Sequence, residues 1–272
     1  MASSNLPHPE RSEASSKGTR CFSSEQISMS DIEAKLRHKV AAVSLLLNAE
    51  NILGYSGHVS VRLPGRDEFL IQPVDQSRAS LRPEHLLVCG MDGRSHERSN
   101  SARPPSEVFI HTEIFRARPD VQAIAHFHHD LTTTFSLVEG VTLRPIKNHA
   151  MRWESGIPTH PDPSHVSSPE LGRDLAATLG PHHAALIRAH GQVVVAEDLP
   201  SLLVDCVHFV ENAEALYRAA TLGKVLPLTA KEMQAFRADF SRESHARKLW
   251  SYYVGKGAAS GIIPEAWLPL LG

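Results

Sequence analysis

The chain has 272 residues, of which 42% are hydrophobic and 21% are charged, and its formal net charge is −2. This composition is ordinary for a soluble globular protein with a core. It lacks the basic excess typical of proteins that bind nucleic acid or anionic membranes, and no apolar run approaches the roughly 20 residues of a membrane span. The three cysteines are widely separated and have no CxxC spacing, so we expect a reducing compartment and a cytoplasmic protein.

Residues 1–27 differ from the rest of the chain in composition. They are rich in Ser, Pro, Glu, Lys and Arg and contain almost no large apolar side chains. We therefore predict a disordered tail over residues 1–27 and one domain over residues 28–272. The tail lacks the hydrophobic segment of a secretory signal, and Glu10 and Glu13 argue against a transit peptide.

The first helix is predicted from a capping pattern and a helical repeat. Ser30-Asp31-Ile32-Glu33 has the spacing of a capping box, so we expect a helix that runs from there to about Ala49. Its apolar side chains recur at helical spacing and are Ile32, Leu36, Val40, Val43 and Leu47. The pattern indicates an amphipathic helix that packs on the core.

A predicted β-hairpin follows. Residues 58–63 alternate between polar and apolar side chains, and a Pro-Gly turn leads to a partner strand at 68–72. His58, Ser60 and Arg62 then share one face of the sheet. That face is either solvated or an edge that recognises an anion, because the planar guanidinium group of Arg62 matches a carboxylate. A further short strand is expected at residues 86–89.

The segment that begins at Pro105 is predicted to be a short helix that carries an acid. Proline at the first helical position sets φ for the first turn, and Pro119 closes the helix. Glu107 lies in that first turn, four residues before His111, so both side chains share one face.

A predicted strand at residues 121–128 carries two histidines. His126 and His128 point to the same side because strand side chains alternate, and two such imidazoles are half of a divalent-metal site. With 17 histidines in the chain, one His-x-His pair is expected by chance. The context strengthens the interpretation, because Glu107 precedes the pair by 19 residues and His190 follows 64 residues after His126, behind a second apolar strand. His190 supplies the third nitrogen that a catalytic metal needs.

The remaining elements alternate between helices and strands. We predict a helix at residues 131–138, a strand at 141–146, and then a loop that holds His149, Arg152 and His160. Polar loop residues often line sites, so His149 is a candidate for substrate contact.

Downstream, Ser167-Ser168-Pro169-Glu170 opens a second capped helix, which is stopped by Gly180. The later predicted elements are a strand at 184–189 that leads to His190, a strand at 192–196, a helix at 199–222 and a last helix capped by Thr229 and Glu232. This mixture of elements predicts an α/β layer structure.

Four motifs, in this order and spacing, resemble the class II aldolase/adducin family. They are Gly57-His58-Val59-Ser60-Val61-Arg62, Ser106-Glu107, His126-Phe127-His128 and His190-Gly191. The resemblance spans about residues 30–255 and is nearest to the decarboxylase branch of the family, which is similar to 3,4-dihydroxyphthalate decarboxylase. It implies a three-layer α/β/α fold with a central, mostly antiparallel sheet, and a homotetramer with the site at a subunit boundary.

The resemblance also implies roles for residues. His126, His128 and His190 would hold a divalent metal, and Glu107 would act as general acid/base or close the vacant metal position. In aldolases of this family a C-terminal tyrosine from a neighbouring subunit can donate a proton, which makes Tyr252 or Tyr253 a candidate here. Aromatic packing is the alternative role of both tyrosines.

The chain departs from the sugar-phosphate aldolases of the family at two places. They carry Asn where this chain has His58, and a Gly-rich, double-Ser segment where this chain has residues 102–106. Two prolines in that segment remove backbone N–H groups that a phosphate would need. We therefore expect a carboxylate-bearing substrate that contacts His58, Ser60, Arg62, Ser106 and His149.

The resulting hypothesis is a metal-dependent carbon–carbon lyase that decarboxylates a hydroxylated aromatic or keto acid in aromatic compound catabolism. Three neutral imidazoles leave the ion at +2, so the electron pair of the broken bond can delocalise onto a metal-bound oxygen as a stabilised enolate. Zinc suits three imidazoles, and manganese, iron or cobalt are alternatives. The competing functions are an aldolase that cleaves a hydroxy-carbonyl substrate, a non-enzymatic scaffold like the adducin head, and an Fe(II) oxygenase.

Overall fold

The computed structural model describes residues 1–2, 28–96 and 102–272. The disordered tail predicted for residues 1–27 therefore lies almost entirely outside the described residues. Among the helices of the described part, none combines the length and the hydropathy that a crossing of a lipid bilayer demands.

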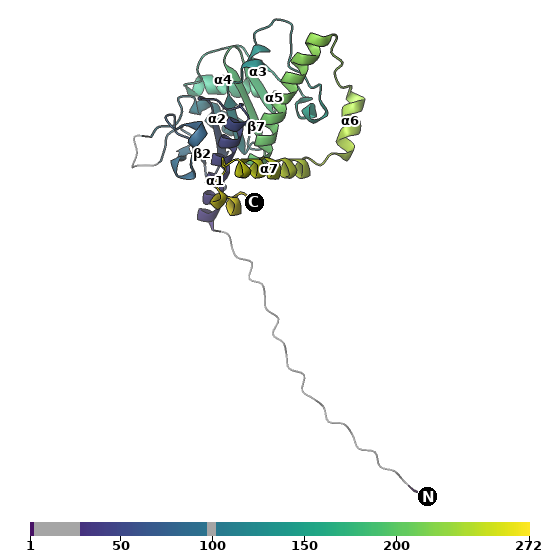
Figure 1. The fold of residues 1–272 in the computed structure, drawn as a ribbon. Coiled ribbons are helices and arrows are strands. Elements are labelled where there is room, and N and C mark those ends of the chain that lie inside the picture. The colour runs from purple at the N-terminus through teal and green to yellow at the C-terminus, as the bar shows by residue number, and fades with distance from the viewer. Residues whose placement is uncertain (3–27, 97–101) are drawn as a thin grey trace.

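The centre of the described structure is one sheet with the strand order β3-β2-β1-β4-β7-β6-β5 (Figure 1). All neighbouring strands are antiparallel except β5 and β6, which are parallel. The strands are β1 (His58–Arg62), β2 (Glu68–Ile71), β3 (Leu87–Gly90), β4 (Ala123–Phe127), β5 (Thr159–His160), β6 (Ala184–Ile187) and β7 (Gly191–Ala196). The predicted mostly antiparallel sheet is confirmed.

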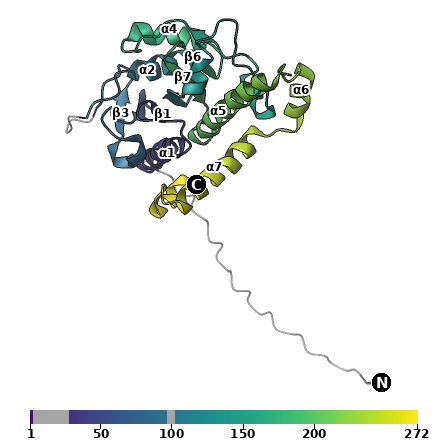
Figure 2. The same ribbon diagram turned by 45° about the horizontal axis from the view of Figure 1, so that its top comes forward.

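Helices cover both faces of this sheet (Figure 2). On one face lie α2 (Val108–Ala117) and α4 (Pro169–Leu179), and on the other lie α1 (Met29–Ala49) and α5 (Leu199–Leu222). Because strand side chains alternate, Val59 and Ala125 belong to the core under α1 and α5, whereas Ile124 belongs to the core under α2 and α4. The three-layer α/β/α prediction is confirmed.

The remaining helices are short or peripheral. They are α3 (Asp130–Thr134), α6 (Ala230–Asp239), α7 (Arg242–Ala259), α8 (Leu268–Leu271) and the 3₁₀ helices η1 (Arg78–Ser80), η2 (Pro83–His85), η3 (Asn148–Trp153) and η4 (Glu265–Trp267). Helix α7 packs along α5, and α8 lies against α1 beside the C-terminus (Figure 1). The sequence predicted that the helix capped by Thr229 is the last one. This prediction is wrong, because α7 and α8 follow it.

Two predicted elements differ in the structure. The helix expected at residues 131–138 ends at Thr134, and the segment 141–146, expected to be a strand, has no regular secondary structure and lies outside the sheet. The side chain of Asn212 on α5 satisfies this backbone: its Oδ1 accepts from Ile146 N at 3.0 Å, and its Nδ2 donates to Arg144 O at 3.0 Å. A buried amide side chain thus replaces the partner strand.

The cap of the first helix also lies at a different residue from the predicted one. Ser28 is the N-cap: its hydroxyl accepts from Asp31 N at 3.1 Å, and the Asp31 carboxylate accepts from Ser28 N at 3.3 Å. The expected acid, Glu33, instead pairs with Arg37 and Arg66. Two overlapping Ser-x-x-acid patterns occur in this segment, and the first one forms the capping box.

The contact between α2 and α4 depends on a glycine. A Cβ atom on Gly172 would lie 2.5 Å from the Phe109 carbonyl oxygen and 2.8 Å from Glu113 Cγ.

We expect Gly172→Ala to lower the free energy of unfolding by about 1–3 kcal/mol, the usual cost of overpacking, measured by urea denaturation. Gly255→Ala in α7 is the control, because nothing lies within 4 Å of its Cβ position, and helix propensity should stabilise it by about 1 kcal/mol. Equal effects of the two changes would contradict this account.

Candidate metal centre

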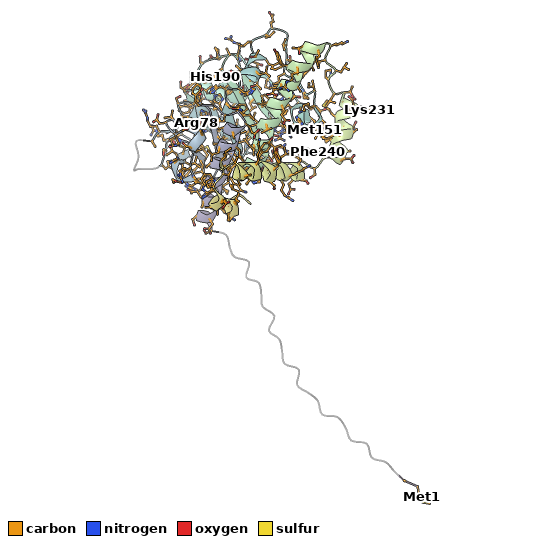
Figure 3. The ribbon with its side chains drawn as sticks, in the orientation of Figure 1. Met1, Arg78, Met151, His190, Lys231 and Phe240 are labelled. Atoms are coloured by element: carbon orange, nitrogen blue, oxygen red, sulfur yellow. The ribbon has the colours of Figure 1, made fainter. Side chains whose placement is uncertain are left out.

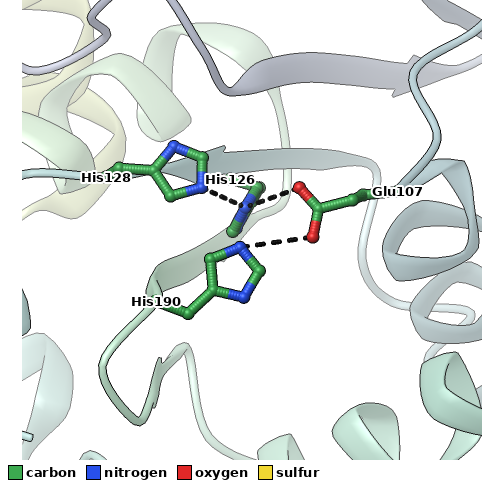
Figure 4. Close-up of side chains that lie close together, drawn as sticks. All are labelled: Glu107, His126, His128 and His190. Atoms are coloured by element: carbon green, nitrogen blue, oxygen red, sulfur yellow. Dashed lines mark hydrogen bonds and ion pairs between the residues drawn. The ribbon is translucent and has the colours of Figure 1, made fainter. Parts of the chain in front are cut away.

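Four ligand groups from separate elements converge on one point (Figure 4). Glu107 is the N-cap residue of α2, His126 lies in β4, His128 follows that strand, and His190 lies in the turn between β6 and β7. His126 Nε2 is 3.4 Å from Glu107 Oε2 and 3.1 Å from His128 Nε2, and His190 Nε2 is 3.2 Å from Glu107 Oε1. All four ligand atoms lie within 4.8 Å of one another.

The backbone around His190 brings this imidazole to the cluster. Ala189 adopts a left-handed conformation with φ of 57° in the turn. At Gly191, a Cβ atom would lie 2.6 Å from the Phe127 carbonyl oxygen and 2.9 Å from the His128 ring. Only glycine permits this approach of β7 to the end of β4.

A backbone carbonyl orients the ring of His126. Nδ1 of His126 lies 3.0 Å from the Gln192 carbonyl oxygen, which accepts its N–H and leaves the Nε2 lone pair directed at the cluster. Neither nitrogen of His190 makes a well-formed hydrogen bond within the described structure. A tetrahedral ion with bonds of about 2.0–2.1 Å separates its ligand atoms by about 3.3 Å. The separations found here fit a divalent metal.

Electrostatics keeps these groups in the states that bind metals. Burial raises the pKa of the Glu107 carboxyl, but interactions with His126 and His190 outweigh burial and hold the pKa well below its ordinary value. Burial, with the neighbouring rings of His126 and His190, lowers the pKa of His128 to about 3. A carboxylate and a neutral imidazole are the forms that coordinate a cation.

A buried chain of hydrogen bonds lies behind Glu107. His58 Nε2 is 4.0 Å from Glu107 Oε2, His58 Nδ1 is 2.7 Å from His111 Nε2, and His111 Nδ1 is 2.5 Å from Ser60 Oγ. Burial lowers the pKa of both rings, that of His111 to about 3, so both are neutral. A carboxylate favours hydrogen on the facing nitrogen of His58. The chain then runs in one direction: Ser60 donates to His111, and His111 donates to His58.

The polar row predicted on β1 consists of His58, Ser60 and Arg62. His58 and Ser60 are buried behind Glu107, so the row is not solvated, and it does not form one continuous binding edge. Arg62 lies apart from the cluster: Nε donates to Val121 O at 2.9 Å, and the guanidinium group also donates to the carbonyl oxygens of Phe115 and Arg118. It stacks on the Phe115 ring at 4.6 Å. Arg62 thus satisfies carbonyls at the C-terminal end of α2, and this corrects the expectation that it recognises an anion.

The other predicted contacts are dispersed in this single chain. Ser106 is exposed beside Glu107. His149 lies in η3, which replaces part of the predicted loop, and groups with residues of α5 rather than with the cluster. Tyr252 is on α7 with 60% of its surface exposed, and its ring contacts Tyr253.

Sequence patterns did not identify two neighbours of Glu107. The Val166 N–H donates to Glu107 Oε1 at 3.2 Å, and His165 Nδ1 lies 3.7 Å from the same oxygen. Both residues lie in the Pro-rich segment before α4, which has no periodic pattern. For His111, which bonds His58 and Ser60, the sequence offered one indication of a place near the site: it follows Glu107 by four residues and shares its helix face.

Comparison with known proteins gives consistent matches. Residues 38–217 match the family described as Class II Aldolase and Adducin N-terminal domain. The chain is 27% identical over 216 residues to 3,4-dihydroxyphthalate decarboxylase of Rhodococcus jostii, which covers 75% of this chain and 88% of that one. It is 29% identical over 184 residues to 5-methylthioribulose-1-phosphate/5-deoxyribulose-1-phosphate aldolase of Rhodospirillum rubrum, which covers 66% of this chain and 79% of that one.

A solved structure supports the fold. L-fuculose 1-phosphate aldolase from Glaciozyma antarctica PI12 superposes with a TM-score of 0.74 at 17% identity, over 90% of this chain and 96% of that one. At this identity the likeness concerns the fold alone.

Removal of one cluster imidazole should remove bound metal. We expect His190→Ala to bind one equivalent of Zn²⁺ fewer per chain than the unaltered protein after equilibrium dialysis, because only two of the three imidazoles that hold the ion then remain. Metal content is measured by mass spectrometry, and circular dichroism checks the fold. His96→Ala is the control, since His96 is exposed and contacts Glu68. Equal metal content in all three proteins would refute the site.

Loss of the Ser60 hydroxyl should destabilise the protein. Ser60→Ala leaves Nδ1 of the buried His111 without its partner, at a cost of about 1–3 kcal/mol. Urea denaturation measures the effect. The control is Ser251→Ala, at an exposed position of α7. It removes a hydroxyl that donates to Arg247 O and should change the free energy of unfolding by less than about 0.5 kcal/mol. A neutral Ser60→Ala would show that the chain of hydrogen bonds does not hold this region.

Proposed function

Because the chain belongs to the class II aldolase and adducin family, we propose that it is a metal-dependent carbon–carbon lyase that decarboxylates a hydroxylated aromatic or keto acid. The observation that supports this most is the convergence of one carboxylate and three imidazoles. His126, His128 and His190 would hold the ion, and Zn²⁺ suits this donor set best, with Mn²⁺, Fe²⁺ and Co²⁺ as alternatives. When bound, the ion supplies a Lewis acid that polarises a substrate oxygen.

Glu107 is the group of this chain that would handle the proton. Loss of carbon dioxide leaves a carbon that must receive a proton. The Glu107 carboxylate, ionised at rest, would take this proton from a substrate hydroxyl group or from water and pass it to that carbon. The Val166 N–H holds one carboxylate oxygen, and His58 faces the other. The carboxylate is therefore oriented before a substrate arrives, which lowers the entropic cost of reaching the reactive geometry. The same position also allows Glu107 to act as a fourth ligand.

The choice of an acid as substrate rests on the segment before Glu107. Pro104 and Pro105 lack the backbone N–H groups that cradle a phosphate. The relative from Rhodococcus jostii is a decarboxylase of a dihydroxylated aromatic acid by its name. Both observations favour a carboxylate over a sugar phosphate, and the name of this relative supports a role in aromatic compound catabolism.

An aldolase that cleaves a hydroxy-carbonyl compound is the second candidate. The relative from Rhodospirillum rubrum is named as an aldolase, and both reactions need an oxygen that accepts the electron pair of the broken bond. A non-enzymatic scaffold has no use for a buried carboxylate among imidazoles, so the cluster argues against that function.

We also propose that the enzyme works in the cytoplasm as a homotetramer. In a single chain Tyr252 lies on the outer surface of α7. In the tetramer, Tyr252 of one chain would reach the metal cluster of a second chain. Its phenol would donate a proton to the substrate there. Size-exclusion chromatography with light scattering tests the tetramer independently of activity.

Substrate class and the role of Glu107 can be tested together. We expect release of CO₂ from one or more dihydroxylated aromatic acids, without aldehyde, when the metal-loaded protein meets a panel of such acids. Glu107→Gln should lower kcat by about 10²–10⁴-fold, the usual contribution of general acid–base catalysis. Glu84→Gln, a change of an exposed carboxylate, is the control.

The products decide between the candidates. Release of an aldehyde from hydroxy-carbonyl compounds without CO₂ from acids would establish the aldolase instead. Uptake of O₂ that depends on iron would point to the oxygenase. Full activity of Glu107→Gln would remove the proposed role of this carboxylate in proton transfer.

A further inference from the structure

A second group of metal-ligating side chains lies outside the Glu107 cluster. His149 comes from η3, and His208 and Glu211 come from α5. One ligand atom of each residue lies within 4.8 Å of the other two. Met151 and Phe240, which line the pocket beside this group, lie well apart from His190 (Figure 3). The group is therefore separate from the first cluster.

The three residues of this group could fill three of the four positions around a tetrahedral ion. Positions 208 and 211 are three apart on α5, so their side chains share one face of the helix. His149 Nε2 is 3.6 Å from Glu211 Oε2, near the separation of about 3.3 Å between ligand atoms on a tetrahedral zinc ion. The rings of His149 and His208 stack with centroids 4.0 Å apart. One nitrogen of each ring lies within 4.8 Å of the other and of a Glu211 carboxylate oxygen.

One nitrogen of this group is buried without a hydrogen bond. His149 Nε2 has no hydrogen-bond partner among the described residues, although its side chain is only 12% exposed. Burial, followed by the charge of its neighbours His208 and Lys147, lowers the pKa of His149 to about 3, and burial lowers that of His208 to about 4. Both imidazoles are neutral near pH 7 and have lone pairs to offer.

The adjoining pocket is better suited to a cation than to an anion. Its volume is about 280 Å³, and three arginines line it. Arg152 and Arg242 are paired with Glu197 and Asp205, and Arg237 is paired with Glu154. The basic groups are thus already neutralised. Among the described residues, the buried side-chain atoms of this pocket without a hydrogen-bond partner are the Nε2 atoms of His149 and His245. A neutral imidazole nitrogen of this kind can bind a transition metal.

We propose that His149, His208 and Glu211 form a second site for a divalent transition-metal ion of the Zn²⁺ type. The ion ties η3 to α5, two segments that are otherwise joined in part by an ion pair between Lys147 Nζ and Glu211 Oε2 at 3.3 Å. The Lys147 side chain is 39% exposed and can turn to solvent when the ion binds. Pocket water supplies the remaining coordination positions.

The test counts bound ions in the full chain. After equilibrium dialysis against Zn²⁺ alone, the unaltered protein should hold two equivalents per chain, and a double variant with His149→Gln and Glu211→Gln should hold one. The matched control combines His182→Gln with Glu214→Gln. It changes the same residue types at an exposed ring that contacts Ser155 and at an acid paired with Arg218 on α5, and should hold two.

A second background separates this site from the first cluster. In the His190→Ala protein one equivalent should remain, and addition of His149→Gln and Glu211→Gln should remove it. Equal zinc content with and without the double change, in both backgrounds, would overturn the second site and leave the first one unaffected. If the double variant does not fold, Glu211→Gln alone at its half-exposed position must weaken zinc binding at least tenfold in the His190→Ala background. Unchanged affinity there overturns the proposal.

Discussion

The carboxylate of Glu107 lies in the interior with imidazole nitrogens of His126, His190, His165 and His58 within 4.0 Å. Burial of an anion is costly unless partners compensate for lost water. Here three separate parts of the fold supply the partners: the sheet, the turn between β6 and β7, and the segment before α4. Any change that separates these elements leaves a buried charge without partners. The stability of the centre and its capacity for a cation therefore have the same physical origin.

The antiparallel register of the sheet sets the positions of these rings. His58 of β1 is directly opposite His126 of β4, which in turn is opposite Val193 of β7. Alternation directs both imidazoles to the face that α2 covers, and α2 begins at Glu107. Helix packing thus brings these two rings and the Glu107 carboxylate together in one buried polar centre. His111, one turn further along α2, completes the hydrogen bonds behind it.

The two imidazole groups of this chain differ in what surrounds them. Around the first cluster the partners include the Gln192 carbonyl of β7 and the Val166 N–H before α4. Such fixed backbone groups suit a centre that must hold its geometry during a reaction. The second group joins a 3₁₀ helix to α5, beside arginines that are already paired with acids. That setting suits an ion that connects segments. Neutral, buried imidazoles are common to both, because burial disfavours the imidazolium form.

Local pattern was sufficient for much of this protein. The periodicities of 3.6 and 2 located α1, α4, α5 and the central strands, and strand alternation placed His126 and His128 on one side, because these features depend on neighbours in the chain. The order and spacing of the motifs indicated the family and the four members of the cluster. Only tertiary structure decided that Arg62 binds the end of α2, that Ser60 bonds His111, and that the segment at 141–146 pairs with a side chain of α5. Such contacts join residues far apart in sequence, and they form only when helices pack on the sheet, which no local pattern encodes.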